Sequence, residues 1–110
     1  MSAIASEERV EICVGQVEGV PPGEGRRFQV GDAEIAVFRG RDGSLYATDD
    51  RCPHRGAPLS DGIFGAGQVI CPYHSYRFSL TDGSCATDST CRLRSYPVRE
   101  ERGLLLVTLE

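Results

Sequence analysis

The chain has 110 residues, of which 40% are hydrophobic and 25% are charged, and its net charge at pH 7 is −4. This length and composition suit one soluble globular domain that spans residues 1–110. The negative charge argues against a nucleic-acid partner, because little of the chain would neutralise a phosphate backbone. The sequence has no apolar run of about 18 residues, so we expect no membrane span.

The chain begins Met-Ser-Ala-Ile-Ala-Ser-Glu-Glu, without the basic segment and apolar core of a signal peptide. We therefore expect residues 1–8 to form a short flexible lead. Five cysteines are an odd number, which fits poorly with the disulfide framework of a secreted domain. Together these features predict a cytoplasmic protein.

Short apolar segments with period-2 alternation predict β-strands along the whole chain. Asp42-Gly43 is a turn signal that predicts a hairpin between two of them, and Thr81-Asp82-Gly83 predicts a later turn. The expected strands cover residues 10–14, 28–30, 34–38, 44–47, 68–70, 76–80, 93–98 and 103–109. Short strands separated by glycine-rich turns indicate an all-β antiparallel sandwich or small barrel. Residues from about 49 to 80 would be inserted into this frame.

The inserted segment contains two short motifs, Cys52-Pro53-His54 and Cys71-Pro72-Tyr73-His74, separated by 16 residues. They include both histidines of the chain. Thiolate sulfur and imidazole nitrogen are metal ligands, so the four residues Cys52, His54, Cys71 and His74 predict a metal site. The neighbouring prolines and Gly56 argue against a helix at either motif, so we expect the ligands on loops.

Three interpretations of these four residues are open. They could be ordinary packed side chains, but four of them rarely fall into this pattern by chance. They could bind structural zinc as an interaction module, although zinc fingers pair Cys with Cys and His with His, with the histidines on a helix. The third interpretation is an iron–sulfur cluster, and it is the one we favour.

The two motifs and their flanks resemble the Rieske proteins. The resemblance lies in Arg51-Cys-Pro-His-Arg-Gly-Ala-Pro-Leu-Ser-Asp-Gly62 and Cys71-Pro-Tyr-His-Ser-Tyr-Arg-Phe78, and it covers almost the whole chain. It implies an antiparallel Rieske-type sandwich with an inserted cluster-binding subdomain. It also implies one 2Fe–2S cluster per chain, with Cys52 and Cys71 on one iron and His54 and His74 on the other.

The sequence departs from the respiratory branch of this family at three positions. The resemblance puts Ala57 and Tyr73 where that branch has a disulfide, and Tyr76 where it has a serine that hydrogen-bonds a cluster sulfur. Fewer hydrogen bonds to the sulfurs stabilise the reduced cluster less. We therefore expect a potential near the low end of the Rieske range, on the order of −150 mV. Exposed histidine rings would make this potential fall as the pH rises.

The resemblance implies a one-electron carrier, not an enzyme. A Rieske oxygenase needs a second, mononuclear iron, but both histidines are already used. Gly23-Glu-Gly25 and Gly65-Ala-Gly67 are too short for a dinucleotide fingerprint, so NAD(P)H would not reduce this chain alone. The family offers two roles: a ferredoxin between a flavoprotein reductase and an oxygenase, or the small subunit of NAD(P)H nitrite reductase beside its large subunit. We favour the first.

Several other residues have two alternative roles. Leu59, Ile63 and Tyr73 are either shields of the cluster or ordinary core, and Asp49 and Asp50 either contact a ligand loop or cap a turn. Arg55, Arg77 and Asp61 are a docking rim or plain solvated charges. Cys13 is expected to be a filler, and Cys85 and Cys91 form a disulfide only if the loop between them folds back.

Overall fold

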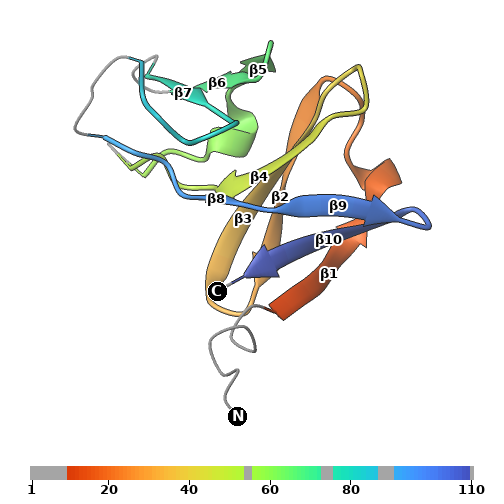
Figure 1. Cartoon of the computed structure of the whole chain (residues 1–110). Helices are drawn as coiled ribbons and strands as arrows, with labels where there is room; N and C mark the ends of the chain where they lie inside the picture. The colour runs from red at the N-terminus through yellow and green to blue at the C-terminus, as the bar shows by residue number, and fades with distance from the viewer. Residues whose placement is uncertain (1–9, 54–55, 73–75, 87–90, 110) are drawn as a thin grey trace.

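The computed structural model describes residues 10–53, 56–72, 76–86 and 91–109 and contains three antiparallel sheets. This confirms the predicted all-β class. Figure 1 shows the third sheet as a separate upper lobe beside the first two sheets. In order across each sheet, the first contains β1 (Val10–Gln16), β10 (Leu104–Leu109) and β9 (Val98–Glu101); the second contains β2 (Glu24–Val30), β3 (Ala33–Arg39), β4 (Leu45–Asp49) and β8 (Ser95–Tyr96); the third contains β5 (Ile63–Gly65), β6 (Gln68–Ile70) and β7 (Arg77–Ser79). The short 3-10 helices η1 (Val17–Gly19) and η2 (Leu59–Asp61) lie in the connections.

Strand β3 is the central element, because it is buried on both faces. Its residues Ile35 and Val37 pack into a lower core between the first two sheets, and Ala36 and Phe38 pack into an upper core under the third sheet. A continuous apolar run is typical of a strand with two covered faces. The second sheet is therefore the shared layer of the molecule, and whatever the upper lobe holds is supported directly on it.

The turn chemistry of the sequence explains the β2–β3–β4 meander. Gly31 has a positive φ of 60° in the turn between β2 and β3, a conformation that costs glycine little. In the next turn the Asp42 carboxylate accepts hydrogen bonds from the backbone amide and the hydroxyl of Ser44. The hairpin predicted at Asp42-Gly43 is confirmed by the pairing of β3 with β4.

The structure corrects the expected strand over residues 93–98. This range contains β8 and only the first residue of β9, Val98; the two strands belong to different sheets, and Pro97 lies between them. Proline has no amide hydrogen to donate to a ladder, so it is a natural point for the chain to leave one sheet and enter another. Strand β5, which has three residues without clear alternation, and the first half of β2 were not predicted.

All of the third sheet lies within the predicted insertion of residues 49–80, although those boundaries stay a prediction. Residues 1–8, expected to be flexible, lie outside the described residues. Among the described residues, the structure has no helix that is long and apolar enough to cross a membrane.

Candidate metal centre

Cys52 is the last paired residue before the tip of a small hairpin. Its amide donates to the carbonyl of Ala57 at 2.8 Å, and the amide of Leu59 donates to the carbonyl of Asp50 at 2.6 Å. Arg51 and Pro58 form the β-bridge between these two hydrogen bonds. The pairing leaves a tip of four residues, 53–56, and His54 belongs to it by sequence. We call this segment, residues 50–59, the first ligand hairpin.

Cys71 has the same position in a second hairpin. Strands β6 and β7 pair in a register that sets Ile70 opposite Arg77, and the Cys71 amide donates to the carbonyl of Tyr76 at 2.7 Å. The tip again has four residues, 72–75, and it includes His74. We call residues 68–79 the second ligand hairpin. Each predicted cysteine ligand therefore closes a four-residue tip that carries one histidine.

The structure brings the two cysteines into one buried core although 19 positions separate them in the sequence. Each has 2% of its surface exposed, and both belong to the upper core with Leu59, Val69 and Phe78. Burying a negatively charged thiolate without a partner is costly, whereas a bound metal compensates its charge. The burial of these cysteines therefore suits metal ligands. His54 and His74 lie outside the described residues, and among the described residues no group of three or more His, Cys, Asp or Glu side chains could hold a metal.

These donors fit a 2Fe–2S cluster of the Rieske type. Such a cluster takes two thiolates on one iron and two imidazoles on the other. The two ligand hairpins together contain two cysteines and two histidines that could supply them. The shared burial of Cys52 and Cys71 agrees with their binding the same iron. Their assignment as ligands, together with His54 and His74, stays a prediction.

Gly62 joins the two ligand hairpins. It ends η2, which follows the first ligand hairpin, and it leads into β5, which pairs with β6. The two chains approach so closely here that a Cβ atom added at Gly62 would overlap the carbonyl oxygen of Ile70. Ile70 directly precedes Cys71. A side chain at position 62 would therefore push the second hairpin away from the first.

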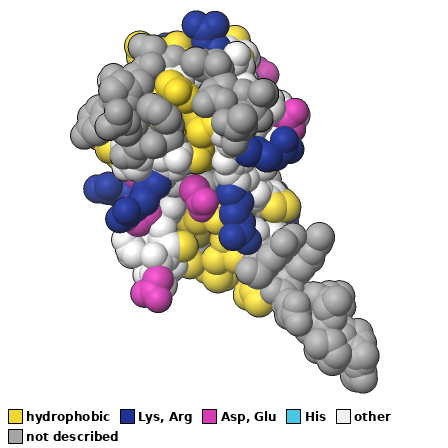
Figure 2. All heavy atoms as spheres, turned by 90° about the vertical axis from the view of Figure 1, so that its left-hand side faces the viewer, with side chains coloured by type: hydrophobic (Ala, Val, Ile, Leu, Met, Phe, Trp, Pro, Cys, Tyr) yellow, Lys and Arg dark blue, Asp and Glu magenta, His cyan; other side chains and the backbone are white. Residues whose placement is uncertain are grey.

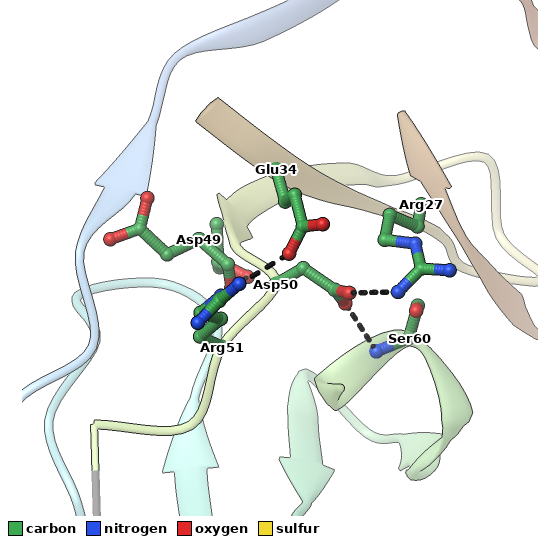
Figure 3. A network of polar contacts seen from close by, with 7 residues as sticks. Arg27, Glu34, Asp49, Asp50, Arg51 and Ser60 are labelled. Carbon is green, nitrogen blue, oxygen red and sulfur yellow. Dashed lines mark hydrogen bonds and ion pairs between the residues drawn. The ribbon is translucent and has the colours of Figure 1, made fainter. Parts of the chain in front are cut away.

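Side chains of the second sheet and a backbone amide of η2 anchor the start of the first ligand hairpin (Figure 3). Asp49 accepts a hydrogen bond from the Tyr96 hydroxyl at 2.5 Å. Asp50 accepts one from the Ser60 amide at 2.8 Å, and Arg51 forms an ion pair with Glu34 at 3.3 Å. Three consecutive residues thus hold the chain just before Cys52. The open question about Asp49 and Asp50 is answered: Asp49 contacts β8, and Asp50 contacts η2.

Asp50 is the most buried charged side chain in this network, with 1% of its surface exposed. Its second carboxylate oxygen, Oδ2, has no hydrogen-bond partner among the described residues and lies 3.7 Å from a guanidinium nitrogen of Arg27. Burial raises the pKa of the Asp50 carboxyl above its usual range, and the hydrogen bond from Ser60 opposes this rise. No apolar pattern or motif identified Asp50 as an anchor, because only the folded chain brings Ser60 and Arg27 to it.

The remaining predicted residues that the structure describes differ in burial. Leu59 is fully buried in the upper core, whereas Ile63 is 72% exposed, so the alternative that Ile63 is an ordinary core residue is wrong. Ile63 lies on β5 at the edge of the third sheet, which leaves its side chain uncovered. Arg77 and Asp61 are exposed, and Cys13 is exposed on β1. Tyr73 and Arg55 lie outside the described residues.

Figure 2 shows the side of the molecule that lies to the left in Figure 1. Basic and acidic side chains are mixed across the middle of this face, and apolar side chains are visible above and below them. The described charges on this face are therefore of both signs, although the whole chain has a net charge of −4.

A profile of the Rieske [2Fe-2S] domain matches residues 10–97, which is most of the chain. The chain belongs to the Rieske [2Fe-2S] family. It is 32% identical over 95 residues to the ferredoxin component of the naphthalene 1,2-dioxygenase/salicylate 5-hydroxylase systems of Ralstonia, and this alignment covers 86% of the chain and 90% of the relative. It is also 34% identical over 104 residues to 4beta-methylsterol monooxygenase of Methylococcus capsulatus, over 84% of the chain. The alignment spans only 28% of that longer relative.

Solved structures show the same fold. A protein from Mycobacterium tuberculosis assigned as the small subunit of NADH-dependent nitrite reductase superposes with a TM-score of 0.85 at 30% identity, over 93% of this chain and 96% of that one. The ferredoxin of carbazole 1,9a-dioxygenase from Nocardioides aromaticivorans superposes with a TM-score of 0.80 at 31% identity, over 89% and 96%. As a Rieske protein the chain has a 2Fe–2S cofactor and functions in electron transfer, and the zinc-module alternative gains no support.

Proposed function

We propose that this chain is a Rieske ferredoxin in which Cys52 and Cys71 bind one iron and His54 and His74 bind the other. It would take electrons from a flavoprotein reductase and deliver them to a terminal oxygenase. Support comes from relatives that match it nearly end to end, including the ferredoxin component from Ralstonia and a second one, of an alkene monooxygenase system, at 31% identity over 83% of that relative.

The observation that carries the ligand assignment is the matched position of the two cysteines. Each closes a four-residue tip with an amide-to-carbonyl bond to the residue five positions later, and each has 2% of its surface exposed in the same core. Two cysteines with unrelated structural roles would not be expected to have the same hydrogen-bond position and the same burial. By sequence, His54 and His74 belong to the four-residue segments that these bonds enclose.

The residues around the site have separate tasks in this proposal. Cys52 and Cys71, which belong to the upper core, would hold one iron, while the anchors Asp49, Asp50 and Arg51 hold the first ligand hairpin in place. When bound, the 2Fe–2S cluster accepts and returns one electron at a time. Tyr76 occupies the position of the serine donor of the respiratory branch, so we expect a potential on the order of −150 mV.

The ligand assignment is tested by iron and acid-labile sulfide content, with an EPR spectrum after dithionite reduction. We expect a stoichiometric cluster with the rhombic signal and low average g value of histidine-ligated clusters. Replacing His54 or His74 by Cys would then change the g values, because a thiolate replaces an imidazole at that iron. A cluster with an unchanged spectrum in both variants would contradict the assignment, as would bound zinc without an EPR signal.

A second candidate function is that of a nitrite reductase small subunit. The high structural similarity to the Mycobacterium tuberculosis protein favours it. The two roles differ in the acceptor. We would mix the reduced protein with the oxygenase of carbazole 1,9a-dioxygenase, because a chain in the solved complex of that oxygenase with its ferredoxin is 33% identical to this chain. In a parallel experiment we would mix it with a nitrite reductase large subunit. Rapid reoxidation by the oxygenase alone supports the ferredoxin, and a stable complex with the large subunit alone supports the second role.

We further propose that residues 1–110 form one Rieske domain whose cluster-binding subdomain covers about residues 49–80. The third sheet and both ligand hairpins lie in this range. A cytoplasmic location is also part of the proposal, since an odd number of cysteines suits a reducing compartment. Fractionation of the native host, followed by detection of the protein, tests the location.

A further inference from the structure

A third hairpin in the upper lobe carries two cysteines that the metal site does not use. Ser84 and Arg92 form an antiparallel β-bridge, and the Leu93 amide donates to the carbonyl of Gly83 at 2.8 Å. In this register the next residues, Cys85 and Cys91, lie directly opposite each other. The loop between them therefore folds back, which is the condition that a disulfide between them requires.

The two side chains also lie on the same face of this hairpin. Ser84 and Arg92 are exposed, whereas Cys85 is 8% exposed and belongs to the upper core, and Cys91 packs against that core. Residues opposite each other in an antiparallel pair project to the same side, so the alternation places both sulfurs on the inner side. Leu93, which is also buried, continues this inner face.

The spacing of such a pair suits a disulfide. Because Gly83 and Leu93 are joined by an amide-to-carbonyl bond, the pair two positions further along is of the hydrogen-bonded type, with Cα atoms about 5.5 Å apart. Disulfides have Cα separations of about 4.4–6.8 Å. The ligand cysteines differ here, since Cys52 lies opposite Ala57 and Cys71 lies opposite Tyr76. No disulfide joins any two of the five cysteines, all of which are among the described residues.

We propose that Cys85 and Cys91 are a redox-active thiol pair that a low-molecular-weight disulfide such as oxidised glutathione converts into an intrachain disulfide next to the cluster-binding core. Cys91 is the more exposed of the two, so its thiolate attacks the glutathione disulfide and releases one glutathione thiolate. The Cys85 thiolate then attacks the Cys91 sulfur and releases the second. The two protons of the protein thiols pass to the two glutathione molecules, so electrons and atoms balance.

The test uses the holoprotein with the background change Cys13→Ser, which removes the exposed thiol on β1. After anaerobic treatment with oxidised glutathione, we expect the mass of the chain to fall by two hydrogens. Cleavage before Asp82 and Asp88 gives the fragments 82–87 and 88–110, which should stay linked until dithiothreitol is added. The visible absorption of the cluster, recorded throughout, shows that the pair reacts while the cluster is bound.

Single variants test the order of the two steps. In Cys85→Ser, the first step has no resolving thiol, so we expect a stable glutathionyl group on Cys91. In Cys91→Ser, the buried Cys85 should react with oxidised glutathione at least about tenfold more slowly than Cys91 does in Cys85→Ser. The proposal is overturned if the parent protein carries a stable glutathionyl group on Cys91 without a linked fragment. It is equally overturned if both cysteines stay reduced where Cys13 of the wild type reacts fully, or if the link forms only after the cluster is lost.

Discussion

The two lobes of this Rieske protein are held together in different ways. The lower lobe contains the long strands, with seven residues in each of β1, β2 and β3, and its core lies between two sheets. The upper lobe contains strands of three residues, and its core includes both proposed cysteine ligands. Short strands of this kind are not stable alone. The comparison indicates that strand pairing stabilises the lower lobe, whereas the upper lobe also depends on its metal centre.

The connection between the lobes follows from the same comparison. Strand β3 supplies Ile35 and Val37 to one core and Ala36 and Phe38 to the other. The anchors begin with Asp49, the last residue of β4, and continue to Arg51. The ligand hairpins are thus attached to the sheet that both cores share. An electron carrier benefits from this arrangement, because a site that moves little reorganises little when its charge changes.

The largest effect should come from removing a cysteine ligand. We expect Cys52→Ser and Cys71→Ser to lose essentially all bound iron, because each would remove a thiolate from a buried site. Hydrogen exchange measured by mass spectrometry should then speed up in residues 56–72 and 76–86, while strands β3 and β10 stay protected. The matched control is Cys13→Ser at an exposed position, which should keep its cluster. Equal loss of protection in both lobes would show that the lower lobe depends on the metal centre as much as the upper lobe does.

The next largest effect should come from separating the two ligand hairpins. We expect Gly62→Ala to lower the free energy of unfolding by about 3 kcal/mol, because the new methyl group overlaps the carbonyl of Ile70. Gly65→Ala is a matched control in the same lobe, since a Cβ atom there meets nothing within 4 Å. It should change the free energy of unfolding by less than about 0.5 kcal/mol. Denaturant titration of both holoproteins, with iron content, measures the difference, and similar values for the two variants would contradict the proposed contact.

A smaller effect should come from the buried anchor of the first ligand hairpin. Asp50→Ala removes the acceptor of the Ser60 amide, and we expect a loss of about 2 kcal/mol in the free energy of unfolding. Asp50→Asn keeps an oxygen acceptor and removes the buried charge, so its loss should be less than half of that. The two variants are compared by denaturant titration at one pH. A loss in Asp50→Asn as large as in Asp50→Ala would show that the ion pair with Arg27, not the hydrogen bond, holds the hairpin.

The difference between the lobes also explains what the sequence could predict. Alternation and turn residues identified the strands of the lower lobe, and the spacing of Cys52, His54, Cys71 and His74 identified the candidate site, because both signals are local. Other features depend on long-range contacts. The burial of Asp50 requires Ser60 and Arg27, the exposure of Ile63 follows from its edge strand, and Cys85 faces Cys91 only because Ser84 pairs with Arg92. Local pattern carries no information on such contacts.

The smallest effect should appear only at alkaline pH, at the hydrogen bond between Tyr96 and Asp49. Burial, aided by this bond, raises the pKa of Tyr96 to about 12 in the folded protein, against 10.0 for an ordinary tyrosine. Both states are protonated below pH 10, so the full contribution of Tyr96 is present there. Between pH 10 and 12 the unfolded chain loses the proton first, and the stability of the wild type should fall by about 1 kcal/mol, because partial exposure of Tyr96 screens much of the interaction.

Tyr96→Phe has no hydroxyl to titrate, so the difference in unfolding free energy between wild type and variant isolates this group. We expect the wild type to be the more stable protein at pH 8, and this advantage to shrink steadily from pH 10 to 12. Denaturant titrations of both proteins across that range measure the difference. Because Asp49 leads directly into the first ligand hairpin, cluster absorbance recorded in the same samples shows whether this bond steadies the upper lobe. An advantage that is constant from pH 8 to 12 would contradict the raised pKa of Tyr96, and the anchoring of the hairpin would then rest on Asp50 and Arg51.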